Sequence, residues 1–131
     1  MDFDLMALKK DGKKILLYYI GATSVIGYRE KAFDKIRKNF RLFIEERDNI
    51  TVILIIDKNM SDKVKIIEDS LMDRLRECLE SVMNNSDIRS FEEDQIEDHI
   101  KYFDAYYGDS SYLSFCFQQR GIPVMIQNVN L

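Results

Sequence analysis

The feature that most constrains the fold is an uninterrupted apolar segment near the middle of the chain, Ile50–Ile56 (ITVILII). A strand with one face in water alternates apolar and polar residues, whereas this segment is apolar at every position except Thr51. Strands of this kind are buried on both faces, as in parallel sheets that carry helices on both sides. The segment is also far shorter than the roughly 20 apolar residues needed to cross a bilayer. It therefore predicts the interior of a parallel sheet in an α/β domain.

Strand and helix patterns alternate along the rest of the chain. Four further strands are expected, at 14–20 (KILLYYI), 88–91, 104–107 and 122–126 (IPVMI). Apolar residues spaced three and four apart predict helices between these strands. The expected helices are one from Arg29 to about residue 44, one from an N-cap at Ser61 to about residue 82, one over 92–102 anchored by Ile96 and Ile100, and one after Ser111. Such alternation is typical of a doubly wound sheet, so we expect a three-layer α/β/α sandwich with a five-stranded parallel sheet in the order 3-2-1-4-5.

The remaining segments are expected to be connections within one domain. Residues 1–12 are interpreted as a lead-in that ends at the turn Asp11-Gly12, residues 21–28 as a glycine-containing loop, and Asn84-Asn85-Ser86 as the end of a helix. The chain has 131 residues, of which 46% are hydrophobic, and no linker-like stretch. A chain of this length builds one core, so we expect a single α/β domain over 1–131 with no room for two full lobes.

Charge and composition exclude several classes of function. The chain has 19 Lys and Arg against 23 Asp and Glu, a formal charge of −4, which disfavours nucleic-acid binding. The N-terminus, Met1-Asp2-Phe3-Asp4, has two acidic residues where a signal peptide would be basic, so we expect a cytoplasmic protein without a membrane span. Cys78 and Cys116 are expected to be small apolar residues in a reducing compartment. With His99 as the single histidine and no metal-binding spacing, no metal or cofactor is expected.

The most informative candidate site is the turn Gly108-Asp109-Ser110-Ser111, between an expected strand and an expected helix. In open parallel sheets, ligands bind beyond the carboxyl ends of the strands. Glycine permits close approach of the backbone, two hydroxyls lie where a helix begins, and the free N–H groups of a first helical turn attract phosphate. The turn therefore predicts a phosphate site. The alternative is that Asp109 or Ser110 only caps the helix.

A second candidate segment, Gly21-Ala22-Thr23-Ser24, follows the first expected strand. Thr23 and Ser24 could line the opposite wall of the same site. The spacing of this segment matches neither the dinucleotide-binding glycine pattern nor a Walker loop, which needs a following Lys-Ser/Thr. It could equally be only a connection.

The stretch 104–131 (DAYYGDSSYLSFCFQQRGIPVMIQNVNL) resembles the end of bacterial CDP-glycerol glycerophosphotransferase-like and glycosyltransferase-like proteins. Residues 13–19 (KKILLYY), the loop after them and Ile50–Ile56 resemble the beginning of the same lobe. The resemblance implies the Rossmann-like, nucleotide-binding C-terminal half of a GT-B fold. In that role Ser110 and Ser111 would bind the diphosphate of a donor such as CDP-glycerol or a nucleotide sugar, and Asp109 would shape the turn.

The chain also departs from that family. After its second strand such a lobe has an Arg-Pro-His-Pro type segment, whereas this chain has Asp57-Lys58-Asn59-Met60. The acceptor-binding N-terminal lobe is absent from the 131 residues, and a transferase of this class works in the cleft between two lobes. We therefore expect a lobe that does not catalyse by itself and that pairs with a missing lobe or with a second copy. Two alternatives stay open: a non-enzymatic interaction or dimerisation module, and a receiver-like domain with Asp57 as its aspartate.

Overall fold

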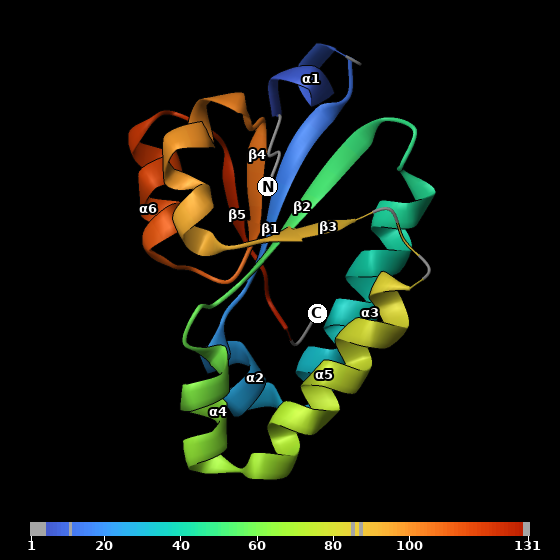
Figure 1. Ribbon diagram of the computed structural model, residues 1–131, viewed down its shortest axis with the longest axis vertical. Helices are drawn as coiled ribbons and strands as arrows, with labels where there is room; N and C mark the ends of the chain where they lie inside the picture. The colour runs from blue at the N-terminus through green and yellow to red at the C-terminus, as the bar shows by residue number, and fades with distance from the viewer. Residues whose placement is uncertain (1–4, 11, 85, 87, 130–131) are drawn as a thin grey trace.

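The computed structural model describes residues 5–10, 12–84, 86 and 88–129. A five-stranded, all-parallel sheet runs through the middle of the molecule, with helices on both of its faces (Figure 1). Its order is β3-β2-β1-β4-β5, which confirms the expected fold class and strand order. The strands are β1 (Lys14–Ile20), β2 (Ile50–Ile56), β3 (Arg89–Phe91), β4 (Ala105–Gly108) and β5 (Val124–Ile126).

The apolar segment β2 has the position that its composition predicts. It pairs with β1 along its whole length, from Lys14 opposite Ile50 to Ile20 opposite Ile56, and its other edge pairs with β3. Ile53 and Ile55 are buried on one face of the sheet, and Val52 and Leu54 on the other. Removing both faces of the strand from water is what makes a continuous run of branched apolar residues favourable here.

Two layers of helices cover the sheet. One face packs against α2 (Ala22–Tyr28), α3 (Glu30–Glu45), α4 (Met60–Ile67) and α5 (Asp69–Met83). The other face packs against α1 (Leu5–Lys10), the 3-10 helices η1 (Glu93–Gln95) and η2 (Glu97–Tyr102), and α6 (Tyr112–Gln119). Within the described part of the chain, none of the helices has the length and apolar character needed to span a membrane.

The prediction of a loop over 21–28 is wrong, because this segment forms the helix α2. Ala22 and Val25 lie one helical turn apart, and both are buried against the core. A helix of seven residues contains only two turns, so its apolar spacing is too short to stand out beside Gly21 at its start and Gly27 within it.

The second expected helix is also different, since Glu68 divides it into α4 and α5. Val64 and Leu71, on either side of the break, are both buried, and their spacing of seven fits one continuous helix equally well. The N-cap position is Asn59 and not Ser61, and it makes no side-chain capping bond.

Two shorter predictions need correction at the other face of the sheet. Residues 92–102 form η1 and η2 and not one α-helix, although Ile96 and Ile100 anchor them as expected. The lead-in contains α1, whose Lys9 pairs with Asp104 at 2.6 Å. Residues 1–4, Asp11, Asn85, Asp87 and residues 130–131 lie outside the described residues, and with them parts of the predicted lead-in and turns.

Candidate functional site

The carboxyl ends of the strands open onto a crevice of about 780 Å³. Its walls come from the segments that follow β1, β2 and β4 and from the residues after β5. β1 is the central strand, with β2 on one side and β4 on the other, so the strand order reverses its direction between β1 and β4. In open α/β sheets, ligands bind at such a switch point, beyond the carboxyl ends of the strands. The crevice is therefore at the position that this topology favours for a ligand.

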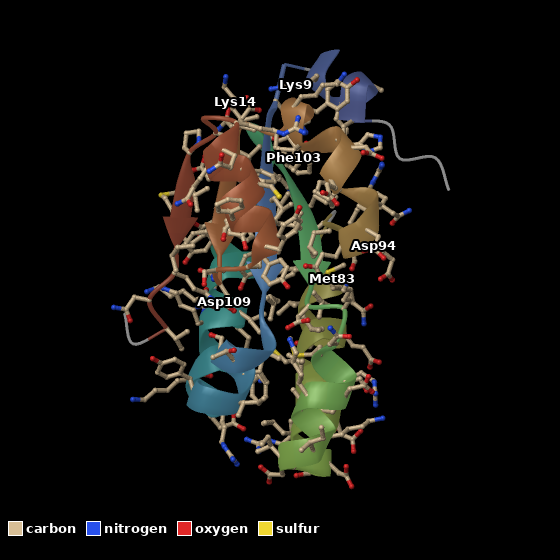
Figure 2. The ribbon with its side chains drawn as sticks, turned by 90° about the vertical axis from the view of Figure 1, so that its left-hand side faces the viewer. Lys9, Lys14, Met83, Asp94, Phe103 and Asp109 are labelled. Atoms are coloured by element: carbon tan, nitrogen blue, oxygen red, sulfur yellow. The ribbon has the colours of Figure 1, made fainter. Side chains whose placement is uncertain are left out.

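The structure brings most of the predicted site residues to this crevice. Figure 2 shows Asp109 on the side of the molecule toward α2, well away from Lys9 and Lys14 near the amino end of β1. The predicted residues that line the crevice are Thr23, Ser24, Asp109, Ser110 and Ser111. Gly108 belongs to the same turn but is not part of the lining.

Gly108 approaches the backbone of the neighbouring strand closely. Its φ is +133°, and a Cβ built on it would lie 2.9 Å from the Tyr19 amide nitrogen and still closer to the Tyr19 carbonyl oxygen. Gly108 pairs with Tyr19 in the parallel ladder between β1 and β4. The glycine thus lets β4 end against β1, which fixes the direction in which the following turn enters the crevice.

Asp109 ties three segments of the crevice together. Its backbone N–H donates to the Tyr19 carbonyl at 3.0 Å, and its Oδ2 accepts from the Gly21 amide at 2.8 Å. Its Oδ1 accepts from Nε2 of Gln127 at 2.7 Å. Both carboxylate oxygens are therefore engaged by the segments that follow β1 and β5. Asp109 therefore holds its turn against the segments that follow β1 and β5.

Ser111 begins the helix α6 as its N-cap. Its Oγ accepts from the Ser114 amide at 3.4 Å, its own amide donates to Oγ of Ser114 at 2.9 Å, and Oγ lies 2.9 Å from the Tyr106 hydroxyl. The expectation that Asp109 or Ser110 caps this helix is wrong, because the cap is one residue further on. Ser110 stays exposed at the crevice and makes no hydrogen bond within the described part of the chain.

The first turn of α2 forms the facing wall. Gly21 occupies its N-cap position without a side-chain capping bond. Ser24 is only 7% exposed, yet its hydroxyl has no hydrogen-bond partner among the described residues. No fully buried side-chain N or O atom of these residues lacks a partner, so the Ser24 oxygen must reach the surface of the crevice. Ser24, with the exposed Thr23 beside it, offers hydroxyl groups opposite Ser110.

Charged residues after β2 and β3 complete the crevice. Asp57 accepts from Nζ of Lys63 and from the Asn59 amide, each at 3.0 Å, and more weakly from the Ala22 amide at 3.4 Å. Burial alone would raise the pKa of Asp57, but these donors outweigh it and lower the pKa below its usual value. Glu93 accepts from the Tyr19 hydroxyl at 3.3 Å and from the Lys58 amide at 3.2 Å.

Among these charged residues only Asp57 had an expected role, as the aspartate of the receiver-like alternative. Asp57 and Lys58 directly follow the continuous apolar strand Ile50–Ile56. Because ligands bind beyond the carboxyl ends of strands, this position indicates both residues as candidate site residues. The strand order 3-2-1-4-5 also bears on the receiver-like alternative, because receivers have the order 2-1-3-4-5. Asp57 ends the second strand, and both of its carboxylate oxygens are held by protein donors.

Within the described residues, no group of three or more His, Cys, Asp or Glu side chains is placed to hold a metal ion. Comparisons of the chain with protein-family models, with curated proteins and with solved structures give no match. The crevice offers hydroxyl groups on two walls and the starts of two helices. Its two lysines, Lys58 and Lys63, are each paired with a carboxylate.

Proposed function

We propose that this chain is a nucleotide-binding lobe that holds the diphosphate of a donor such as CDP-glycerol or a nucleotide sugar at the switch-point crevice. One observation carries the proposal. Hydroxyl groups without protein partners, those of Ser110 on one wall and of Ser24 on the other, meet in a single crevice beyond the carboxyl ends of β1 and β4. Hydroxyls of this kind are suited to donate hydrogen bonds to phosphate oxygens.

The backbone around Ser110 supports the same ligand. The first N–H groups of a helix have no partner inside the helix, and Ser111 satisfies only that of Ser114 in the first turn of α6. The amides of Tyr112 and Leu113 are thus available beside the Ser110 hydroxyl. Because Ser111 is already engaged as the cap, Ser110 is the serine that would contact the diphosphate directly, and Ser111 would hold the helix in place.

The charges of the crevice limit how tightly a diphosphate can bind. Lys63 is paired with Asp57, and Lys58 lies 3.6 Å from Asp94, so each lysine must leave a carboxylate to reach a phosphate. We therefore expect binding that is weak and sensitive to salt. The carboxylates that line the crevice, Asp57, Glu93 and Asp109, each accept hydrogen bonds from the protein on both oxygens, and the proposal is for binding without catalysis by this chain alone.

Calorimetry with CDP-glycerol, CDP, UDP and inorganic pyrophosphate tests the proposal. Binding of the diphosphates is expected, with about tenfold weaker affinity in Ser110→Ala because a hydrogen bond to a charged group is lost. Ser90→Ala removes an exposed serine from β3 that does not line the crevice, and it should bind like the wild type. Absence of heat with every ligand at millimolar concentration would refute the proposal, as would equal weakening in the two variants.

A second candidate function is a protein-interaction or dimerisation module. Tyr112 on α6 and Ile126 on β5 are exposed apolar residues that both line the crevice, and Phe115 is exposed on the same helix as Tyr112. Adjacent exposed apolar residues of this kind are typical of interaction surfaces. Sedimentation velocity should show a concentration-dependent dimer that is lost in Phe115→Ser. A monomer at all concentrations would exclude dimerisation through this surface.

A further inference from the structure

The helical layer that borders the crevice is built from two broken helices of the same design. After β1, the short helix α2 is followed by the long helix α3, with the single residue Arg29 between them. After β2, the short helix α4 is followed by the long helix α5, with the single residue Glu68 between them. Figure 1 shows α2 and α4 together beyond the carboxyl ends of β1 and β2, while α3 and α5 run alongside each other toward the opposite end.

The two breaks have unusual backbones. Arg29 has φ 50° and ψ −113°, and it is the only residue other than glycine with a positive φ in the described part of the chain. An L-residue in this region carries backbone strain, which the surrounding structure must impose. Glu68 is fully extended, with φ −163° and ψ 114°, between two helical segments. Each break is a single non-helical residue about which a short helix can change its direction.

The side chains of the two breaks join each other. Nη1 of Arg29 lies 2.5 Å from Oε2 of Glu68, and Oγ of Ser70 donates to the other oxygen of Glu68 at 3.1 Å. Neither Arg29 nor Glu68 makes any other ion pair among the described residues. The short helices α2 and α4 pack on each other, and so do the long helices α3 and α5. The ion pair therefore lies where the pair of short helices meets the pair of long helices.

Of the four helices in this layer, only the short helices α2 and α4 reach the crevice. Residues 22–24 and 28 of α2 line it, as do Lys63 of α4 and Asn59 at its start, whereas no residue of α3 or α5 does. The outer end of α4 is loosely held, since Ile66 is 83% exposed and Ile67 is 52% exposed. A change of direction at the two breaks would therefore move one wall of the crevice and leave the long helices on the sheet.

We propose that α2 and α4 form a hinged wall of the crevice, which moves as one body about Arg29 and Glu68, and that the Arg29–Glu68 ion pair holds this wall in the observed position. The hinged wall consists of residues 22–28 and 60–67. Weakening the ion pair should raise the opening of both short helices together, because each packs on the other. The proposal goes beyond ligand binding and is tested without a ligand, so its failure would leave the proposed function untouched.

Hydrogen exchange measured by mass spectrometry on Glu68→Gln tests the hinged wall. Exchange in residues 22–28 and 60–67 should become about two- to fivefold faster, as expected for loss of an exposed ion pair, with α3, α5 and the sheet unchanged. The charge-exchanged double variant Arg29→Glu/Glu68→Arg should restore slow exchange. Asp73→Asn makes the same change of charge but breaks the Arg76–Asp73 pair inside α5, and it should leave both short helices unchanged.

A second measurement needs no variant. Raising the salt concentration from 0.05 to 1 M shortens the screening length from about 14 Å to about 3 Å and should accelerate exchange in α2 and α4 of the wild type by a similar factor. Faster exchange in only one short helix would overturn the idea of a single moving body. Equal acceleration in all helices, or none in Glu68→Gln, would overturn the role of the ion pair.

Discussion

The substitution Gly108→Ala offers the sharpest test of how the crevice is built. A φ of +133° is accessible to glycine and costs other residues about 1–3 kcal/mol. The added Cβ would also meet the backbone of Tyr19, including its amide nitrogen at 2.9 Å. Backbone cannot rotate away as a side chain does, so β4 would have to move from β1, at a cost of about 1–3 kcal/mol for overpacking. We expect Gly108→Ala to lower the free energy of unfolding by about 4 kcal/mol.

Two other glycines separate the contributions to this cost. Gly121 has a φ of +75° with no atom near its absent Cβ, so Gly121→Ala should cost about 1–2 kcal/mol from the backbone alone. Gly27 lies inside α2 with open space around it, so Gly27→Ala should stabilise by about 0.5–1 kcal/mol. Urea unfolding followed by circular dichroism measures all three. If Gly108→Ala cost no more than Gly121→Ala, the close approach of β4 to β1 would be refuted.

The remaining predictions concern polar contacts of two residues, Asn39 and Asp104, that do not themselves line the crevice. Asn39 is buried and donates to the Tyr18 hydroxyl at 3.0 Å, so Asn39→Ala should cost about 1–3 kcal/mol in urea unfolding, and a neutral result would show that this contact is dispensable. Burial would raise the pKa of Asp104, but the Lys9 ammonium and the Ile15 amide lower it below the usual 3.8. Because the folded-state pKa is lowered, the stabilisation by Asp104 is complete above pH 4 and disappears as the pH falls through the folded-state pKa. Asp104→Asn should therefore be less stable than the wild type by about 1 kcal/mol at pH 7, and the difference should shrink toward pH 3; a difference independent of pH would contradict this.

The sheet was predictable because its strands are specified by local composition. The continuous run Ile50–Ile56 can be stable only with both faces covered, and this requirement determined the parallel sheet and the layers of helices. The alternation of strands and helices favours a doubly wound sheet, and 3-2-1-4-5 is one of the common strand orders of such sheets. The helical layer was less predictable, because the breaks at Arg29 and Glu68 do not disturb the spacing of buried residues. They depend on how the two short helices pack on each other, which no local pattern records.

The candidate site was predictable as a position but not in its detail. The turn after β4 follows from the rule that ligands bind beyond the carboxyl ends of strands, and Asp109, Ser110 and Ser111 lie at the crevice. Which of these residues caps the helix and which one binds the other segments of the crevice was not predictable. Ser111 is the cap because its oxygen reaches the Ser114 amide, and Asp109 is engaged because Gln127 returns to it after β5. The first contact reaches three residues along the chain and the second joins two segments through the fold, so neither partner lies within the tetrapeptide.

The central claim is that a diphosphate binds between the turn at Ser110 and the first turn of α2. A titration of ¹⁵N-labelled protein with CDP, followed residue by residue in amide NMR spectra, tests it most directly. The amides of Thr23, Ser24, Ser110, Tyr112 and Leu113 should shift together along one saturable curve, while those of Lys9 and Lys14 at the opposite end of the sheet should not move. Shifts confined to other surfaces, or unchanged spectra at millimolar CDP, would contradict the claim.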